Sequence, residues 1–208
     1  MATINVNNAR AIFEKHMPEA SVDYCYQLWQ EFNFNFKISR KRNSKLGDYK
    51  FDPRSGEHSI SVNENLNVYS FLITYVHEVA HLIVQLKYKG RVQAHGREWK
   101  SAFKKLMYAL LNDKVFPSDL LGVLAQHMKN PKASSTSDRS LQLALNAYDP
   151  PSNEILLKDL DQGDKFLFNK RTFQKIELRR TRSLCLCLDN SRKYLISDTA
   201  AVKKFKHA

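Results

Sequence analysis

Residues 70–90 read SFLITYVHEVAHLIVQLKYKG, and their pattern predicts one long helix. Apolar side chains recur at helical spacing on two faces of this segment, which is typical of a helix buried nearly all round. Gly90 follows the last patterned residue, where glycine commonly ends a helix. We therefore expect a helix over about residues 70–89, lying in the core of a domain.

Within this segment His77, Glu78 and His81 form the pattern H-E-x-x-H. Side chains four residues apart project from the same helix face, so the two imidazoles can converge on one tetrahedral Zn²⁺. Glu78 follows the first ligand, where it can act as general base without binding the metal. The alternative is an ordinary helix whose histidines make core hydrogen bonds. Two buried histidines with a glutamate between them are costly unless paired or metal-bound, which favours the zinc site.

A catalytic zinc needs a third protein ligand and an open position. His95 is the leading candidate, because it follows the glycine turn after the helix and precedes Gly96, so the backbone can return it to the metal. His58, Glu64 and Glu98 remain alternatives, since each lies in or near a segment that could approach the same helix.

The flanking segments predict an α+β domain over residues 1–129. Alternating and helical spacings predict helices near residues 8–16, 21–32, 97–112 and 119–129, and strands near 34–38, 49–51 and 59–63. Turn-like residues separate the three strands, so we expect a small antiparallel sheet.

Beyond residue 129 the sequence predicts a different kind of structure. Residues 130–153 are expected to be a linker containing a short helix at 140–148. Residues 154–208 are expected to form a small, basic, β-rich domain. Its Cys185 and Cys187 lack the four-ligand pattern of a structural zinc site, so we interpret them as core residues.

The charge of the chain favours polyanionic partners, because the formal net charge is +12 and the isoelectric point is about 9.6. We expect contact with DNA or another nucleic acid, and the alternative is an ordinary solvated surface. The candidate contact residues are Arg40, Lys41, Arg42, Lys170, Arg171, Lys175, Arg179, Arg180 and Arg182.

The cellular compartment of the protein is predicted from features that the sequence lacks. Three cysteines do not form a disulfide framework, and the N-terminal residues lack the apolar core of a signal peptide. No stretch has the apolar length of a membrane span. We expect a soluble, cytoplasmic protein without membrane contact, and the sequence indicates no oligomeric state.

Residues 75–103, YVHEVAHLIVQLKYKGRVQAHGREWKSAF, resemble the zinc-binding core of the SprT family, which includes the Spartan proteases. That family follows H-E-x-x-H with a histidine in an H-G-x-x-aromatic motif, represented here by residues 95–99. The resemblance implies a zincin-like minimal metalloprotease fold, in which the active-site helix packs on a small antiparallel sheet. It also implies one Zn²⁺ per chain on His77, His81 and His95, with Glu78 as base. Many members carry a C-terminal zinc ribbon with two cysteine pairs, which this chain does not have.

These features predict a zinc metallopeptidase of SprT type that acts on proteins associated with nucleic acid. One alternative is a transcription-related, nucleic-acid-associated protein whose zinc is structural and which lacks significant protease activity. Another is a peptidase unrelated to DNA. Glu78 favours a peptidase, because a structural zinc site has no use for a general base. Tyr75, Tyr88 and Arg97 are unranked candidates for stabilising the oxyanion.

Overall fold

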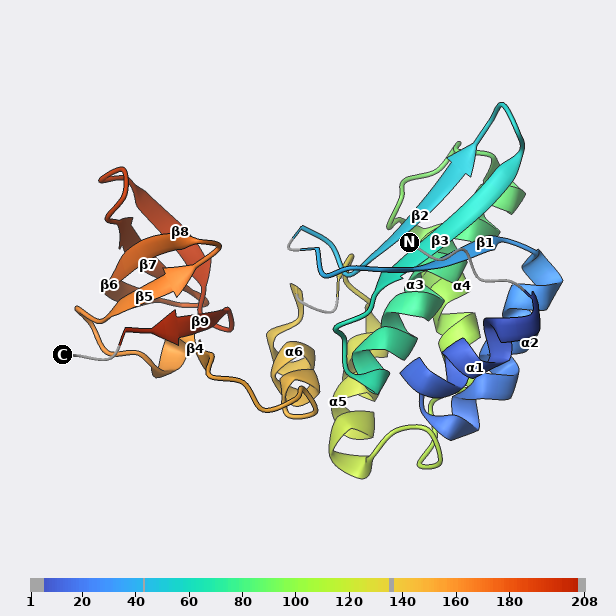
Figure 1. Cartoon of the computed structure of the whole chain (residues 1–208). Coiled ribbons are helices and arrows are strands. Elements are labelled where there is room, and N and C mark those ends of the chain that lie inside the picture. The colour runs from blue at the N-terminus through green and yellow to red at the C-terminus, as the bar shows by residue number, and fades with distance from the viewer. Residues whose placement is uncertain (1–5, 43, 135–136, 206–208) are drawn as a thin grey trace. The chain divides into compact units, whose positions relative to one another are not determined.

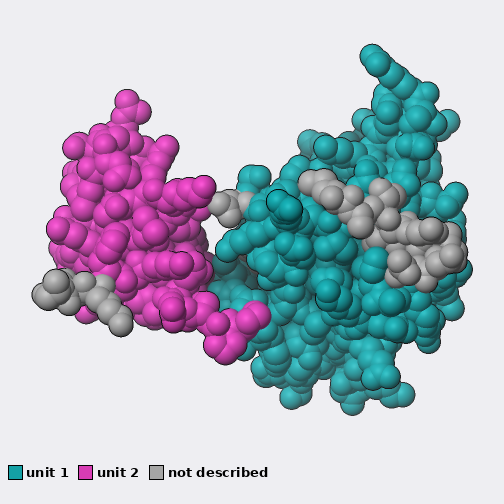
Figure 2. All heavy atoms as spheres, in the orientation of Figure 1, with its two compact units in different colours: residues 1–149 teal, residues 150–208 magenta. Residues whose placement is uncertain are grey.

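The computed structural model describes residues 6–42, 44–134 and 137–205. The chain is of the α+β class and divides into two compact units, residues 1–149 and residues 150–208 (Figures 1 and 2). Among these described residues, the first unit contains six α-helices and one sheet, and the second contains the other sheet.

The central element of the first unit is the helix α3, Val68–Tyr88. Its start is fixed by the Asn67 side chain, which accepts a hydrogen bond of 2.9 Å from the backbone N–H of Ser70. Its end is a left-handed residue, Lys89, followed by Gly90, which also has a positive φ. The long helix expected over residues 70–89 is therefore present, with ends shifted by one or two residues.

The sheet of the first unit is mixed, which corrects the expected antiparallel arrangement. It consists of β1 (Asn35–Ser39), β2 (Gly47–Asp52) and β3 (Glu57–Asn63), in the order β1-β3-β2. β2 and β3 form an antiparallel hairpin, whereas β1 pairs with β3 in parallel. The reason is that β3 lies between β1 and β2, so the strands that follow one another in sequence are not neighbours and β2 becomes an edge strand.

The helices pack around α3. They are α1 (Val6–His16), α2 (Val22–Phe32), α4 (Arg97–Tyr108), α5 (Ser118–Lys129) and α6 (Arg139–Asn146), with the short 3-10 turn η1 (Glu19–Ser21). α3 contacts β2 and β3 on one side and α4 on another (Figure 1). Phe13, Phe36 and Tyr75 form an aromatic centre, with ring centroids 5.3–5.5 Å apart. No helix among the described residues has the length and apolar character to cross a bilayer.

The segment expected as a linker is divided between the two units. Its helix α6 packs on α5, and Leu141 and Leu145 are buried in the core of the first unit. Asn67 donates hydrogen bonds to the Leu145 carbonyl and to the Asp149 carboxylate, at 3.0 and 2.6 Å. The second unit begins at Pro150.

The second unit is a six-stranded sheet in the order β4-β9-β5-β6-β7-β8. Its elements are β4 (Ile155–Leu156), the 3-10 turn η3 (Leu157–Asp159), β5 (Lys165–Phe168), β6 (Arg171–Arg179), β7 (Arg182–Cys187), β8 (Lys193–Ser197) and β9 (Ala201–Lys204). Cys185 and Cys187 are free thiols buried in its core beside Phe166 and Phe173. Their burial matches the interpretation of these cysteines as core residues.

Candidate metal centre

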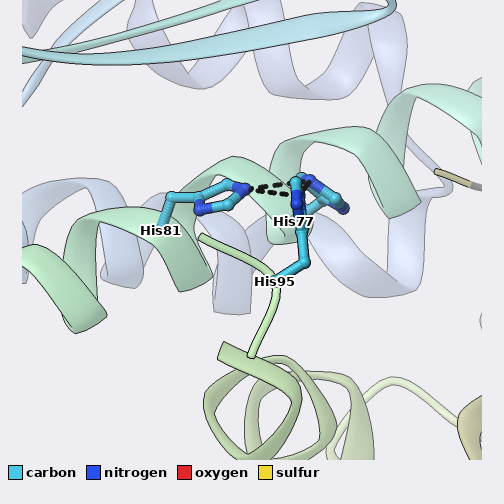
Figure 3. A group of neighbouring side chains, drawn as sticks. All are labelled: His77, His81 and His95. Carbon is cyan, nitrogen blue, oxygen red and sulfur yellow. Dashed lines mark hydrogen bonds between the residues drawn. The ribbon is translucent and has the colours of Figure 1, made fainter. Parts of the chain in front are cut away.

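Three imidazoles converge at the middle of α3 (Figure 3). His77 and His81 project from one face of the helix, and His95 approaches from the loop that precedes α4. Their Nε2 atoms lie 3.1 Å apart between His77 and His81, 3.0 Å between His81 and His95, and 3.2 Å between His95 and His77. Within the described part of the chain this is the only group of histidine, cysteine and carboxylate side chains placed to hold a metal ion.

The donor set fits a tetrahedral metal. Nitrogens bound at about 2.0–2.1 Å to a tetrahedral Zn²⁺ lie roughly 3.3 Å from one another, close to the observed separations. Hydrogen bonding alone does not account for the arrangement. A neutral imidazole has one N–H and one lone pair on its two ring nitrogens, so three Nε2 atoms at mutual contact cannot all be satisfied by one another. A cation at their centre would use all three lone pairs.

Trp99 of α4 supports the three histidines from behind. Its ring centroid lies 4.5 Å from that of His77, 5.5 Å from that of His81 and 4.9 Å from that of His95. The indole is fully buried and stacks on Phe103, 5.0 Å away. The aromatic residue of the H-G-x-x-W motif therefore packs against all three histidine side chains.

The histidines are neutral in the protein without metal. Burial, together with the neighbouring imidazoles, lowers the pKa of His77 to about 2 and that of His81 to about 4. Burial also lowers the pKa of His95. A neutral imidazole is the form that binds a metal, so the fold prepares the ligands at physiological pH.

Glu78 lies on the same helix as the first two histidines and is buried. Burial, together with the negative charge of Asp48, raises the pKa of its carboxyl group to about 8. The backbone N–H of Tyr49 and the positive charges of Arg42 and Lys45 act in the opposite direction. A carboxyl group with a pKa near neutrality is suited to accept and return a proton.

The site opens into a cleft of about 630 Å³. The middle of α3 forms its floor, the start of β2 and the preceding loop form one wall, and the loop before α4 forms another. Two residues of the segment before α6 complete the lining. The described lining residues are Ser44, Lys45, Leu46, Gly47, Asp48, Tyr49, Ile73, Thr74, His77, Glu78, His81, Val84, Gln85, Gly90, Val92, Ala94, His95, Ala133 and Ser134.

The three alternative ligands lie elsewhere. The Nδ1 atom of His58 is 2.7 Å from the hydroxyl oxygen of Tyr49, and its ring stacks on Phe51. Glu64 is exposed just beyond the end of β3, and Glu98 is half-buried on α4. Neither carboxylate belongs to the histidine group among the residues searched.

None of the three expected oxyanion candidates lines the described cleft. Tyr75 is fully buried, and its hydroxyl donates a 2.9 Å hydrogen bond to the Cys25 carbonyl. Tyr88 packs against the core, and Arg97 is exposed at the start of α4. The tyrosine in the cleft wall is Tyr49, which sequence reasoning missed. No local signal could have found it, because its position depends on the pairing of β2 at the sheet edge.

The basic residues near the site have two different environments. Arg40 and Lys41 are exposed, whereas Arg42 is half-buried. Its guanidinium donates to the side-chain oxygen of Asn63 at 2.7 Å and to the hydroxyl of Ser61 at 3.1 Å. Arg42 therefore fixes the loop that forms the cleft wall to strand β3, in addition to supplying positive charge.

Lys175 also differs from the solvent-facing residue expected from the sequence. It is buried in the second unit, where its ammonium donates hydrogen bonds to the carbonyls of Leu157, Lys158 and Leu160. The alternation of β6 explains this, because Lys175 shares the inward face with Phe173. Its charge is used inside the fold and is not presented to a partner.

The other five candidate contact residues of the second unit are exposed and form two clusters. Lys170 and Arg171 lie at the turn between β5 and β6, and Arg179, Arg180 and Arg182 lie at the turn between β6 and β7. The two turns are at opposite ends of β6, a strand of nine residues. At a rise of about 3.3 Å per residue the clusters are roughly 26 Å apart.

Comparison with known protein families matches residues 12–119 to the SprT-like family. This segment contains the H-E-x-x-H helix, the loop with His95, and Trp99. Searches of curated proteins and of solved structures gave no match. The matched segment covers more than half of the chain and includes all of its metal-centre histidines, so this protein belongs to the SprT-like family.

Proposed function

We propose that this protein is a zinc-dependent metallopeptidase of SprT type with a zincin-like first unit. The observation that supports this most strongly is the position of Glu78. Its carboxyl group lies in the same cleft as the three histidines, buried and with a pKa raised to about 8. A structural zinc site has four protein ligands and is closed, whereas three ligands beside an open cleft are typical of a catalytic site.

His77, His81 and His95 would hold one Zn²⁺ through their Nε2 atoms. When bound, the zinc ion acts as a Lewis acid that lowers the pKa of a coordinated water and polarises a carbonyl group. Glu78 would accept the proton of the attacking water and deliver it to the leaving nitrogen of the peptide bond. The nearby positive charge of the metal would favour the ionised carboxylate that the first step requires.

The shape of the cleft supports a polypeptide substrate. One of its walls is the start of β2, which is an edge strand of the sheet. An edge strand has backbone groups on its outer side that pair with no other strand, and those of β2 other than the Tyr49 N–H can pair with an extended chain. A peptide lying along β2 would therefore pass directly over Glu78 and the histidines.

The test is cleavage of an unfolded protein, such as denatured casein, by Glu78→Gln. We expect one zinc per chain in both the wild type and the variant, and a loss of kcat of about 10²–10⁴-fold in the variant. Glu98→Gln is the matched control, because this glutamate is half-buried on α4 and outside the described cleft lining. A Glu78→Gln protein that cleaves casein as fast as wild type would refute the proposed role.

We also propose that the substrates are proteins associated with nucleic acid. The net charge of +12 and the exposed arginine cluster between β6 and β7 support this. The alternative is a nucleic-acid-associated protein without significant protease activity. This alternative predicts that the protein binds nucleic acid and that its zinc-loaded form cleaves no protein substrate. The three free cysteines suit a reducing compartment, and on this ground we propose a cytoplasmic location.

A further inference from the structure

The first residue of β2, Gly47, lies directly against the catalytic face of α3. A Cβ atom added at this position would be 2.5 Å from Oε1 of Glu78, 2.6 Å from Cγ2 of Thr74 and 2.9 Å from Cγ of Glu78. Carbon and oxygen atoms that are not bonded do not approach this closely, because the contacts fall well inside the van der Waals minimum of about 3.5–4.0 Å. A side chain at this position would therefore force the side chains of Glu78 and Thr74 to shift.

The reason for glycine here is space and not backbone conformation. Positive φ angles occur at Gly56, Gly90 and Gly163, and Gly47 is not among them. An alanine at residue 47 would adopt the same backbone without strain, and its methyl group would meet the side chains of Glu78 and Thr74. Gly122 of α5 is different, because an added Cβ there meets nothing within 4 Å.

The same strand contacts the carboxyl group a second time. The backbone N–H of Tyr49, two residues after Gly47, faces the carboxyl group of Glu78 and acts to lower its pKa. β2 can make this contact only if it lies close to α3, and the missing side chain at residue 47 is what permits that approach. The carboxyl group is thus held between the helix that carries it and the edge of the sheet.

We propose that Gly47 is a positioning residue for Glu78, whose missing side chain lets β2 close on the carboxyl group and keep it in the cleft beside the three histidines. This inference rests on the proposed function of Glu78 as general base. An added methyl group would push the carboxylate out of place without touching the histidines. The effect should appear in the chemical step and not in metal binding.

The first experiment compares Gly47→Ala with wild type as full-length, zinc-loaded proteins cleaving the same fluorogenic peptide. We expect kcat to fall by about 10–100-fold, because a misplacement of about 1 Å at a catalytic group has this effect. KM should change by less than about 3-fold and the zinc content should stay at one per chain. Gly122→Ala, the matched control, should retain wild-type kcat and zinc content. A folded Gly47→Ala protein that contains zinc and has wild-type kcat would overturn the proposal.

A second variant relieves the crowding. Thr74→Ser removes the Cγ2 atom that an alanine at residue 47 would meet, and it keeps the hydroxyl that donates to the Ser70 carbonyl at 2.7 Å. We expect Thr74→Ser to raise kcat in the Gly47→Ala background relative to its effect in the wild-type background. Equal effects in both backgrounds would contradict the steric account. This double variant also keeps the test available if Gly47→Ala alone folds poorly.

The contact between a side chain at residue 47 and Glu78 can also be tested by a measurement that does not depend on activity. Gly47→Ala should lower the Tm of the metal-free protein by about 3–8 °C, as overpacking does in a chain of this size. Much of that loss should disappear in the Glu78→Ala background, where the crowded side chain is gone. The same loss in both backgrounds would refute the contact. A smaller loss of Tm in the Glu78→Ala background, together with a wild-type protein that cleaves no peptide, would support the contact and reject the proposed function.

Discussion

At the scale of single residues, Trp99 connects the sequence motif to the geometry of the site. The three imidazoles take their orientation from one indole, which is fully buried between them and Phe103. Metal affinity should therefore depend on the shape of this side chain, although it supplies no ligand atom.

The corresponding prediction concerns Trp99→Phe. A smaller ring leaves part of the space behind the imidazoles empty, so the histidines lose support and zinc affinity should fall by about 10-fold, the lower end of the effect of outer-shell partners. Competition with a chromophoric chelator measures this change. Phe103→Leu is the comparison, because the Phe103 ring packs against His77 alone of the three ligands, with centroids 5.9 Å apart, and it should alter zinc affinity less. Equal zinc affinities for wild type and Trp99→Phe would show that the indole does not orient the ligands.

A second residue-scale prediction follows from the pKa of Glu78 in the metal-free protein. The unfolded chain ionises this residue above about pH 4.5, whereas the folded protein retains the proton up to about pH 8. Between these values the folded state binds more protons than the unfolded state, so the free energy of unfolding falls as the pH rises. Glutamine has no proton to lose and avoids this penalty.

Glu78→Gln should therefore be more stable than wild type at pH 8, and the difference should shrink towards pH 4.5. The change in the difference between these pH values should be on the order of 2–4 kcal/mol. Urea unfolding in the presence of a chelator measures it, and the histidines contribute equally to both proteins. A difference that does not vary with pH would show that the Glu78 carboxyl group is not held neutral by burial.

At the scale of elements, local patterns predicted α3, the two histidines on it and the H-G-x-x-W motif, because each depends on residues close in sequence. The parallel pairing of β1 with β3 could not be predicted in this way. It depends on contacts between residues far apart in sequence, such as those of Arg42 with Ser61 and Asn63 of β3. The positions of Gly47 and Tyr49 beside Glu78 depend on where β2 lies in this sheet. Local sequence patterns could therefore not predict them either.

The exposure of Lys175 was predicted wrongly for a different reason. It lies two residues after Phe173 in a predicted strand, so the period of two already placed both on one face. The charge of lysine argued for solvent, and the carbonyl groups around η3 satisfied its ammonium in the core. In this strand the alternation of side chains predicts the burial of Lys175 correctly, whereas the charge of lysine does not.

An element-scale prediction concerns Asn67, which links two helices of the first unit. Its side chain caps α3 and donates to the Leu145 carbonyl and the Asp149 carboxylate. Asn67→Ala removes a cap and leaves the carbonyl of Leu145 without this donor, so the free energy of unfolding should fall by about 2–3 kcal/mol. Asn65→Ala, at an exposed neighbouring position, should change it by less than about 0.5 kcal/mol in the same urea titration. Equal stability of the two variants would contradict this role of Asn67.

At the scale of the whole molecule, the exposed charge of the second unit makes the nucleic-acid proposal testable. Three exposed arginines lie at the turn between β6 and β7, and the pair Lys170 and Arg171 lies roughly 26 Å away at the other end of β6. If the arginine cluster contacts phosphates, replacing Arg179, Arg180 and Arg182 by alanine should make the slope of log K against log salt shallower by about 2–3.

Fluorescence anisotropy with a labelled DNA duplex at several salt concentrations measures this slope. The Lys170→Ala, Arg171→Ala variant is the comparison, because its residues lie at the opposite end of the strand. Its effect on the slope should be independent of the triple replacement. An unchanged slope in the triple variant would remove this cluster from any nucleic-acid surface.

The most direct test of the zinc-peptidase proposal is a zinc titration of the chelator-treated protein during cleavage of a fluorogenic peptide. Three neutral imidazoles at a single centre predict that activity is absent without metal, rises in proportion to added zinc and levels off at one equivalent per chain. His95→Ala should require much more zinc to reach any activity, because it lacks one of the three ligands. Full activity of the metal-free protein, or a titration that does not level off at one equivalent, would contradict a single catalytic zinc on His77, His81 and His95.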